Sequence, residues 1–327
     1  MRNTGPESPV PRAKSGGGGA GNAISLGPAG AAAGQGRAGE DARLFDLGYR
    51  SYDGLRERPV RAILTLAVFT MRRVLGLGRG GRHKVLPAIT LAIAYLPALV
   101  SVAFSVIADD ILPNDLISYG DYMFFIGSAL ALFAALVAPE ALCPDRRSGM
   151  LGLYLAGPLD RTRYLAAKGA GVIAVMLLIT LGPLLFMLLA FTLAGFGPSA
   201  GETPELLLDI LAAGVVTALL YASLSMAVSS LTTRRAAAAV GVVLLLFVPV
   251  SVVRSAIDSA GAPDELDLLS FPFVAGELAY RIFGETPDDD EPITQLSTGL
   301  VAVGLGAAIL AGALLCWLRY RRIEGFR

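Results

Sequence analysis

Long apolar segments alternate with short polar segments from residue 85 to the end of the chain. An apolar run of about 20 residues is long enough to cross the hydrocarbon core of a bilayer as a helix, because each helical residue rises about 1.5 Å. The sequence therefore predicts an all-α integral membrane protein with six transmembrane helices. The predicted spans cover residues 85–107, 122–138, 169–195, 206–229, 236–253 and 298–318.

A shorter apolar run precedes the first predicted span. It holds ten uncharged residues between Arg61 and Arg72, and a helix of that length rises only about 15 Å, which is too little to cross a bilayer. Its basic ends suit a helix that lies in the cytoplasmic membrane interface and leads into the first span. An ordinary linker helix is the alternative. We therefore interpret residues 45–84 as a cytoplasmic, partly interfacial segment and residues 85–327 as the six-span domain.

The first 44 residues differ from the rest in composition, because they are rich in glycine, alanine, serine and proline. Such a segment cannot bury enough apolar surface to order itself, so residues 1–44 are predicted to be a disordered cytoplasmic tail. They lack the unbroken apolar core of a signal peptide, and no cleavage is expected.

Connecting segments with many basic residues alternate along the chain with segments that have few or none. They are frequent in residues 43–84 and 144–168 and after the last span, but absent from residues 108–121 and 196–205. The segment 254–297 carries two arginines against ten acidic residues. Because lysine and arginine gather in the cytoplasmic loops of membrane proteins, the alternation predicts that both termini are cytoplasmic.

The composition agrees with a membrane protein, since 54% of the residues are hydrophobic and 17% are charged, against about 25% charged in soluble domains. The two cysteines, Cys143 and Cys316, cannot make a disulfide framework in a chain of this length and are expected to be free thiols. The predicted spans have no ionisable residue near their centres, whereas carriers driven by ion gradients usually keep such residues for the coupling ion. A gradient-driven carrier or channel is therefore the less favoured alternative.

Nucleotide-binding and catalytic patterns are absent from the sequence. The three lysines, Lys14, Lys84 and Lys168, do not lie in a phosphate-binding loop, so ATP is expected to bind elsewhere. The single histidine, His83, lies among arginines and joins no acidic or nucleophilic cluster. The chain is therefore not expected to be an enzyme, and a membrane-embedded enzyme is the remaining alternative.

The connection between the second and third predicted spans is the most organised polar segment. Gly149 is expected to end or turn the second-span helix, residues 150–156 form a short apolar stretch, and Asp160 can cap a new helix. Arginines and Lys168 edge this element with positive charge. The pattern predicts either a small helix that docks in the cleft of a soluble protein or a basic loop that only satisfies the orientation rule.

The segment from Asp145 to Lys168 reads D-R-R-x-G-x-L-x-L-Y-x-x-x-P-L-x-R-x-x-Y-x-x-x-K. This pattern resembles the loop after the second span of type-2, exporter-type (ABC-2-like) ABC transporter permeases. Met150 stands where that family usually has threonine, and Asp160 where it usually has serine. Residues 45–59, FDLGYRSYDGLRERP, are also similar to permeases of this kind from actinobacteria.

The resemblance implies that the chain is the multi-pass permease subunit of an ATP-driven exporter in the plasma (inner) membrane. ATP would be held by a separate cytoplasmic ABC ATP-binding subunit, so the chain itself would need no cofactor or metal. A second permease protomer, identical or related, and membrane lipid are the other implied partners, and nucleic acid is not one. The implied ATPase-coupling loop consists of Asp145, Arg146, Arg147, Gly149, Leu151, Pro158, Leu159, Arg161 and Lys168.

Two further patterns concern packing. Gly304, Ala308 and Gly312 recur at every fourth position of the last predicted span, and such a row lets another helix approach closely. Residues 254–297 are too apolar for a free linker and are predicted to form short helices. These helices either dip into the outer leaflet and cap the exit of a pathway or lie as an amphipathic surface helix.

Overall fold

The computed structural model describes residues 59–78, 80–107, 118–156, 159–195, 197–199, 201–285 and 292–322. The predicted tail, residues 1–44, and the first part of the predicted interfacial segment lie outside these ranges. All regular structure in the described part is helical. The all-α prediction is confirmed.

Six helices among the described residues are long and apolar enough to cross a membrane, as the sequence predicts. They are α2 (Arg82–Ile107), α3 (Tyr119–Arg147), α5 (Arg161–Ala194), α6 (Thr203–Leu231), α7 (Arg235–Ala260) and α9 (Thr298–Arg322). The shorter helices are α1 (Pro59–Val74), α4 (Met150–Ala156), η1 (Asp264–Leu269), α8 (Phe271–Ile282) and η2 (Pro292–Gln295).

The long helices extend beyond the predicted spans, most clearly in α3 and α5. The second predicted span ends at residue 138, whereas α3 continues through Pro139, Glu140 and Pro144 to Arg147. The third begins at residue 169, whereas α5 starts at Arg161. The length of an apolar run predicts only the part of a helix that lies in the hydrocarbon core. It does not predict where charged residues continue the helix beyond that part. The extra turns carry charged residues, among which Glu140, Asp145 and Lys168 are paired in the folded chain.

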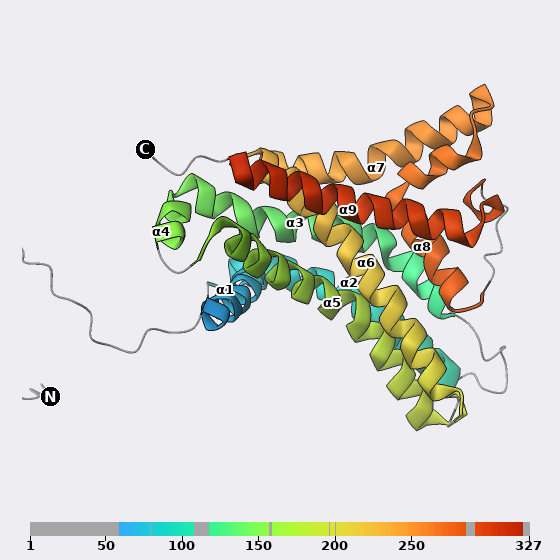
Figure 1. The fold of residues 1–327 in the computed structure, drawn as a ribbon. Helices are drawn as coiled ribbons and strands as arrows, with labels where there is room; N and C mark the ends of the chain where they lie inside the picture. The colour runs from blue at the N-terminus through green and yellow to red at the C-terminus, as the bar shows by residue number, and fades with distance from the viewer. Residues whose placement is uncertain are drawn as a thin grey trace, which may run out of the picture. The chain divides into compact units, whose positions relative to one another are not determined.

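The helix α3 is the most enclosed of the six. In its most apolar stretch 67% of the residues are buried, against 22% in α7 and in α9. It contacts α2, α5, α6, α7 and α8, while α5 and α6 run side by side and α6 packs on α9 (Figure 1). Tyrosine hydroxyls join the helices: Tyr122 donates to the Ala94 carbonyl at 2.7 Å and Tyr221 to the Gly127 carbonyl at 3.1 Å. Each such bond contributes only about 0.6 kcal/mol in a membrane protein, so close side-chain packing carries most of the stability.

The helix α1 confirms that a separate helix precedes the first span. It packs on α5 so closely that a Cβ on Gly171 would lie 2.7 Å from the Ala67 carbonyl oxygen. Its other face leaves Leu64 and Val68 exposed. A helix with one face on the bundle and an apolar outer face suits the membrane interface.

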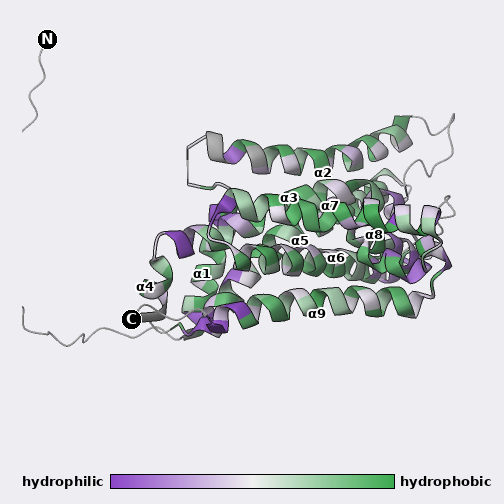
Figure 2. Cartoon of the chain, turned by 90° about the horizontal axis from the view of Figure 1, so that it is seen from above, coloured by the Kyte–Doolittle hydropathy of each residue, from purple (hydrophilic) through white to green (hydrophobic). Residues whose placement is uncertain are grey.

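Polar residues gather at the two ends of the described bundle, with apolar helix between them (Figure 2). One end contains α1, α4, the last turns of α3, α6 and α9, and the first turns of α5 and α7. Because arginines are concentrated there, we call it the basic end. The other end contains η1, α8 and η2, and we call it the opposite end.

The short helix α8 at the opposite end lies against α3 rather than on the surface. Every residue from Val274 to Tyr280 is buried, and Phe124 of α3 meets Phe273 edge to face at 5.4 Å. Glu285, just after α8, accepts hydrogen bonds from Ser118 Oγ at 2.6 Å and the Gly120 N–H at 2.8 Å. The predicted short helices are therefore present, and α8 is part of the core.

Candidate functional site

Residues 145–168, predicted to form a docking element, lie at the basic end (Figure 1). Gly149 follows α3 with a φ of 71°, a left-handed conformation that favours glycine. After α4, the Asp160 side chain accepts a hydrogen bond from the Arg163 N–H at 2.8 Å and caps α5. The predicted order of glycine turn, short helix and capped helix is confirmed. Pro158 lies outside the described residues.

Asp145, in the last turn of α3, is the centre of a buried ion-pair network. Its side chain is 2% exposed. The Lys168 Nζ lies 2.6 Å from one carboxylate oxygen, which also accepts a hydrogen bond from the Tyr164 hydroxyl at 3.0 Å. Arg73 of α1 donates to the other oxygen at 2.9 Å. One carboxylate therefore joins α3 to α5 and to α1.

Glu140, one turn earlier on the same helix, extends the network to α7. Its side chain is 8% exposed, and Arg235 Nη1 lies 2.6 Å from one oxygen and Arg73 Nε 3.6 Å from the other. Breaking a buried ion pair by removing one partner costs about 3–5 kcal/mol, because the remaining charge loses both water and its counter-ion. Half-exposed Arg235 belongs at the lower end of that range. The network thus fixes α1, α3, α5 and α7 to one another at the basic end.

Two arginines of the predicted coupling loop bind other helices of the same chain. Arg146 Nη1 donates to the carbonyls of Ser230 at 2.5 Å and Thr232 at 3.2 Å, at the end of α6. A cation at this position also suits the negative end of the helix dipole. Arg161 Nη1 donates to the carbonyl of Arg321 at 2.9 Å and joins α5 to the end of α9.

The outer surface of α4 is apolar rather than basic. Leu153 is 65% exposed and Met150 is 40% exposed. Tyr154 is half-buried; its ring lies 5.6 Å from that of Tyr164, and Lys168 Nζ lies 6.0 Å from its centre. Burial, with help from nearby Asp145, raises the pKa of Tyr154, so its hydroxyl stays neutral. The helix therefore offers leucine and methionine outward and touches the ion-pair network through Tyr154.

The other residues singled out from the sequence have distinct places. Arg147 is exposed, Leu151 and Leu159 are buried, and Ala308 packs partly buried against the core.

A Cβ on Gly312 would lie 2.9 Å from the Ser223 backbone of α6, whereas one on Gly304 would meet the Leu268 side chain of η1 at 3.1 Å. The small-residue row therefore packs against two different elements, α6 and η1. Cys143 and Cys316 are buried, free thiols, as expected.

Arg73, Glu140 and Arg235 belong to this site although the sequence pattern does not single them out. Arg73 lies in the basic segment 43–84, and Arg235 follows another arginine between two predicted spans. Nothing local in the sequence shows which of these basic side chains turn inward. Glu140 carried a usable signal, since an acidic residue directly after a long apolar run is costly in a membrane unless it is paired.

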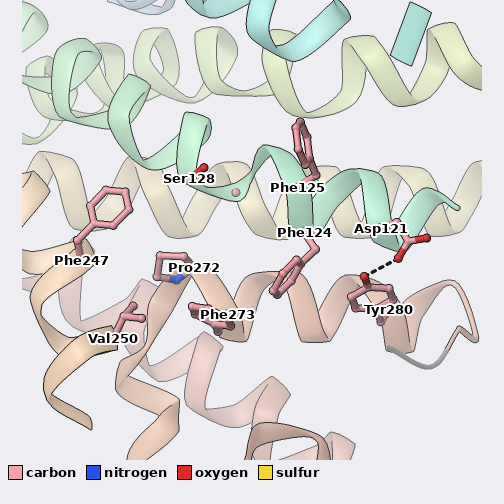
Figure 3. Close-up of a pocket in the computed structure, with 10 residues that line it drawn as sticks. Asp121, Phe124, Phe125, Ser128, Phe247, Val250, Pro272, Phe273 and Tyr280 are labelled. Carbon is pink, nitrogen blue, oxygen red and sulfur yellow. Dashed lines mark hydrogen bonds between the residues drawn. The ribbon is translucent and has the colours of Figure 1, made fainter. Parts of the chain in front are cut away.

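A cavity of about 620 Å³ lies toward the opposite end, between α3, α7 and α8. Figure 3 shows Phe124 and Phe273 together on one side and Phe247 with Val250 on another. At the far side the Tyr280 hydroxyl donates to Asp121 at 2.7 Å. The cavity thus has aromatic and aliphatic walls and one polar corner. Such a lining suits an apolar or amphipathic molecule.

Six apolar helices of spanning length define a multi-pass membrane protein. Charges are paired at one end of the bundle, and a short helix with exposed apolar side chains connects two of the spans there. The profile of the ABC-2 family transporter protein family matches residues 50–324, and the chain belongs to that family of permeases. None of the curated proteins compared with the chain matches it. Permeases of this family are transport components that generally pair with ATP-binding subunits and dimerise, usually in the plasma membrane.

Proposed function

We propose that the chain is the membrane-spanning permease subunit of an ATP-driven exporter, and that a separate cytoplasmic subunit binds and hydrolyses the ATP. The observation that carries this proposal is the exposed apolar surface of α4, which projects between α3 and α5 and contacts the buried network through Tyr154. A rigid short helix with leucine at its surface suits a cleft in a soluble partner. In this proposal ATP is bound and hydrolysed by the partner subunit.

In this proposal the basic end faces the cytoplasm. Arg146, Arg161 and the arginines in the last turn of α9 lie there, and lysine and arginine concentrate on the cytoplasmic side of membrane proteins. Both termini are then cytoplasmic, and α1 lies in the cytoplasmic interface. The opposite end, with α8, faces outward.

Movement would pass from α4 into the spans through packed and paired side chains. A push on α4 reaches Tyr154 and then Lys168 and Asp145, which hold α5 and α3 together. Glu140 and Arg235 extend the connection to α7. Because the Asp145–Lys168 pair between α3 and α5 is buried, these two helices would shift together as rigid bodies.

The cavity between α3, α7 and α8 is the best candidate in the described part for a section of the pathway. Its aromatic walls favour lipophilic or amphipathic cargo over small ions. A second protomer, identical or related, would complete a central passage. Membrane lipid surrounds the remaining faces.

The substitution Leu153→Glu tests the docking surface of α4. A carboxylate in place of the exposed leucine must be desolvated in an apolar cleft, so we expect co-purification with the co-expressed ATP-binding subunit to fall about tenfold, equivalent to about 1.4 kcal/mol. ATP hydrolysis by the complex in vesicles should fall with it. Leu77→Glu is the control, because Leu77 is also exposed at the basic end but outside α4.

Unchanged co-purification and ATP hydrolysis in the Leu153→Glu variant would contradict docking through α4. Flux of an amphipathic dye, driven by an ion gradient through the purified chain without nucleotide or partner, would instead support the carrier alternative and overturn the exporter proposal.

A further inference from the structure

A second groove lies near the basic end, on the face formed by α5, α6 and α9. Its volume is about 310 Å³, and hydrocarbon makes up nearly all of its surface. Leu165 and Ile173 of α5 form one wall and Ile309 of α9 the other. This groove is separate from the cavity at the opposite end and from the ion-pair network.

Small residues keep the groove open. Gly169 of α5 and Ala313 of α9 line it, and neither side chain can fill the space between the helices. Close contact between α6 and α9 at Gly312, where a Cβ would lie 2.9 Å from the Ser223 backbone, narrows the base of the groove. The result is a long apolar slot of the kind that holds a hydrocarbon chain.

Two guanidinium groups and an indole lie where the groove reaches the basic end. Arg161 of α5 donates to the Arg321 carbonyl at 2.9 Å and so joins the two walls. The Arg321 guanidinium stacks over the Trp317 ring at 4.6 Å, and Trp317 lines the groove. Tryptophan and arginine together are typical of the boundary between the hydrocarbon core and the headgroups.

We propose that this groove binds an anionic phospholipid, with one acyl chain in the slot and the phosphate against Arg161 and Arg321. The apolar walls exclude a polar metabolite, and guanidinium groups bind phosphate oxygens with matching geometry. Each basic residue near an anionic lipid surface adds a favourable interaction that a zwitterionic lipid does not provide. The proposal rests on the chain lying in a membrane and is independent of the ATP-binding partner.

Lipid binding in the groove can be measured by tryptophan fluorescence, because Trp317 is the only tryptophan of the chain. The full chain would be reconstituted in vesicles, and its fluorescence quenched with phosphatidylglycerol or phosphatidylcholine carrying brominated acyl chains. We expect brominated phosphatidylglycerol to bind the groove at least about fivefold more tightly than brominated phosphatidylcholine. This factor corresponds to the interaction of one arginine with an anionic lipid, about 1 kcal/mol.

The substitution Ala313→Phe would fill the slot and is expected to abolish this preference. Ala307→Phe is its matched control, since Ala307 is exposed on the same helix but does not line the groove. Circular dichroism and size-exclusion profiles would verify that both variants fold.

The substitution Arg161→Gln would remove one charge while keeping a donor for the Arg321 carbonyl, so we expect about fivefold weaker preference for the anionic lipid. Arg322→Gln is its control, because Arg322 lies about 140° around the helix from Trp317 and should not reach the groove. This pair keeps the test valid if Ala313→Phe does not fold.

Three results would overturn the proposal. Equal quenching by the two brominated lipids would mean that the groove does not select charge. Absence of quenching by either lipid would mean that another protein surface covers Trp317. A full preference that survives in folded Ala313→Phe, or in Arg161→Gln, would place anionic lipid recognition elsewhere on the chain.

Discussion

Lys168 and Asp145 belong to the sequence pattern that resembles the coupling loop of exporter permeases, and they also form a buried ion pair inside the chain. Neither is available to a partner, because Lys168 is fully buried and Asp145 is 2% exposed. Arg146 likewise turns inward to the end of α6. Asp145, Arg146 and Lys168 therefore hold the element in place, whereas Arg147, Leu153 and Met150 are exposed and can touch another protein.

We predict that Lys168→Met lowers the free energy of unfolding by about 3 kcal/mol, because Asp145 loses a buried counter-ion while keeping Arg73. Thermal unfolding of the purified chain in detergent measures this change. Lys84→Met is the control, since Lys84 is exposed. The double variant Lys168→Met with Asp145→Asn should recover part of the loss, and no recovery would argue against an energetic link between the two residues.

At the scale of elements, α6 and α9 approach each other closely along their backbones. The sequence row of small residues predicts such an approach, and Gly312 supplies it against the Ser223 backbone. Gly304, in the same row, meets a side chain of η1 instead. A repeated small residue thus marks a face that packs closely but does not identify the neighbour.

We expect Gly312→Leu to destabilise the chain by about 1–3 kcal/mol, because the new side chain would force α6 and α9 apart. Gly306→Leu is a matched control on the same helix, since a Cβ on Gly306 meets nothing within 4 Å. Thermal unfolding of both variants provides the comparison. Equal stability of the two would show that the α6–α9 contact does not limit the fold.

At the scale of the whole molecule, the arrangement of charge sets the expected orientation. The basic end gathers arginines from α1, α3, α5, α7 and α9, although they are far apart in the sequence. The opposite end holds α8 and its acidic neighbours. This asymmetry supports the proposal that the basic end is cytoplasmic.

Cysteine labelling tests that orientation. In a background with Cys143→Ala and Cys316→Ala, we expect Ser199→Cys, between α5 and α6, to react with a membrane-impermeant maleimide in intact cells. Thr233→Cys, between α6 and α7, should react only after the membrane is permeabilised. Both natural side chains are exposed, so access to the reagent decides the result. The reverse labelling pattern would contradict the proposal that the basic end is cytoplasmic.

The sequence by itself determined the six spans, the short helix before them and the capped turn at Asp160, because each depends on a local property. A spanning helix needs a continuous apolar run, and a cap needs one side chain beside one backbone N–H. The folded structure alone decided which charges turn inward. Arg146 and the Ser230 carbonyl that accepts its hydrogen bond are 84 positions apart, and only helix packing brings such partners together.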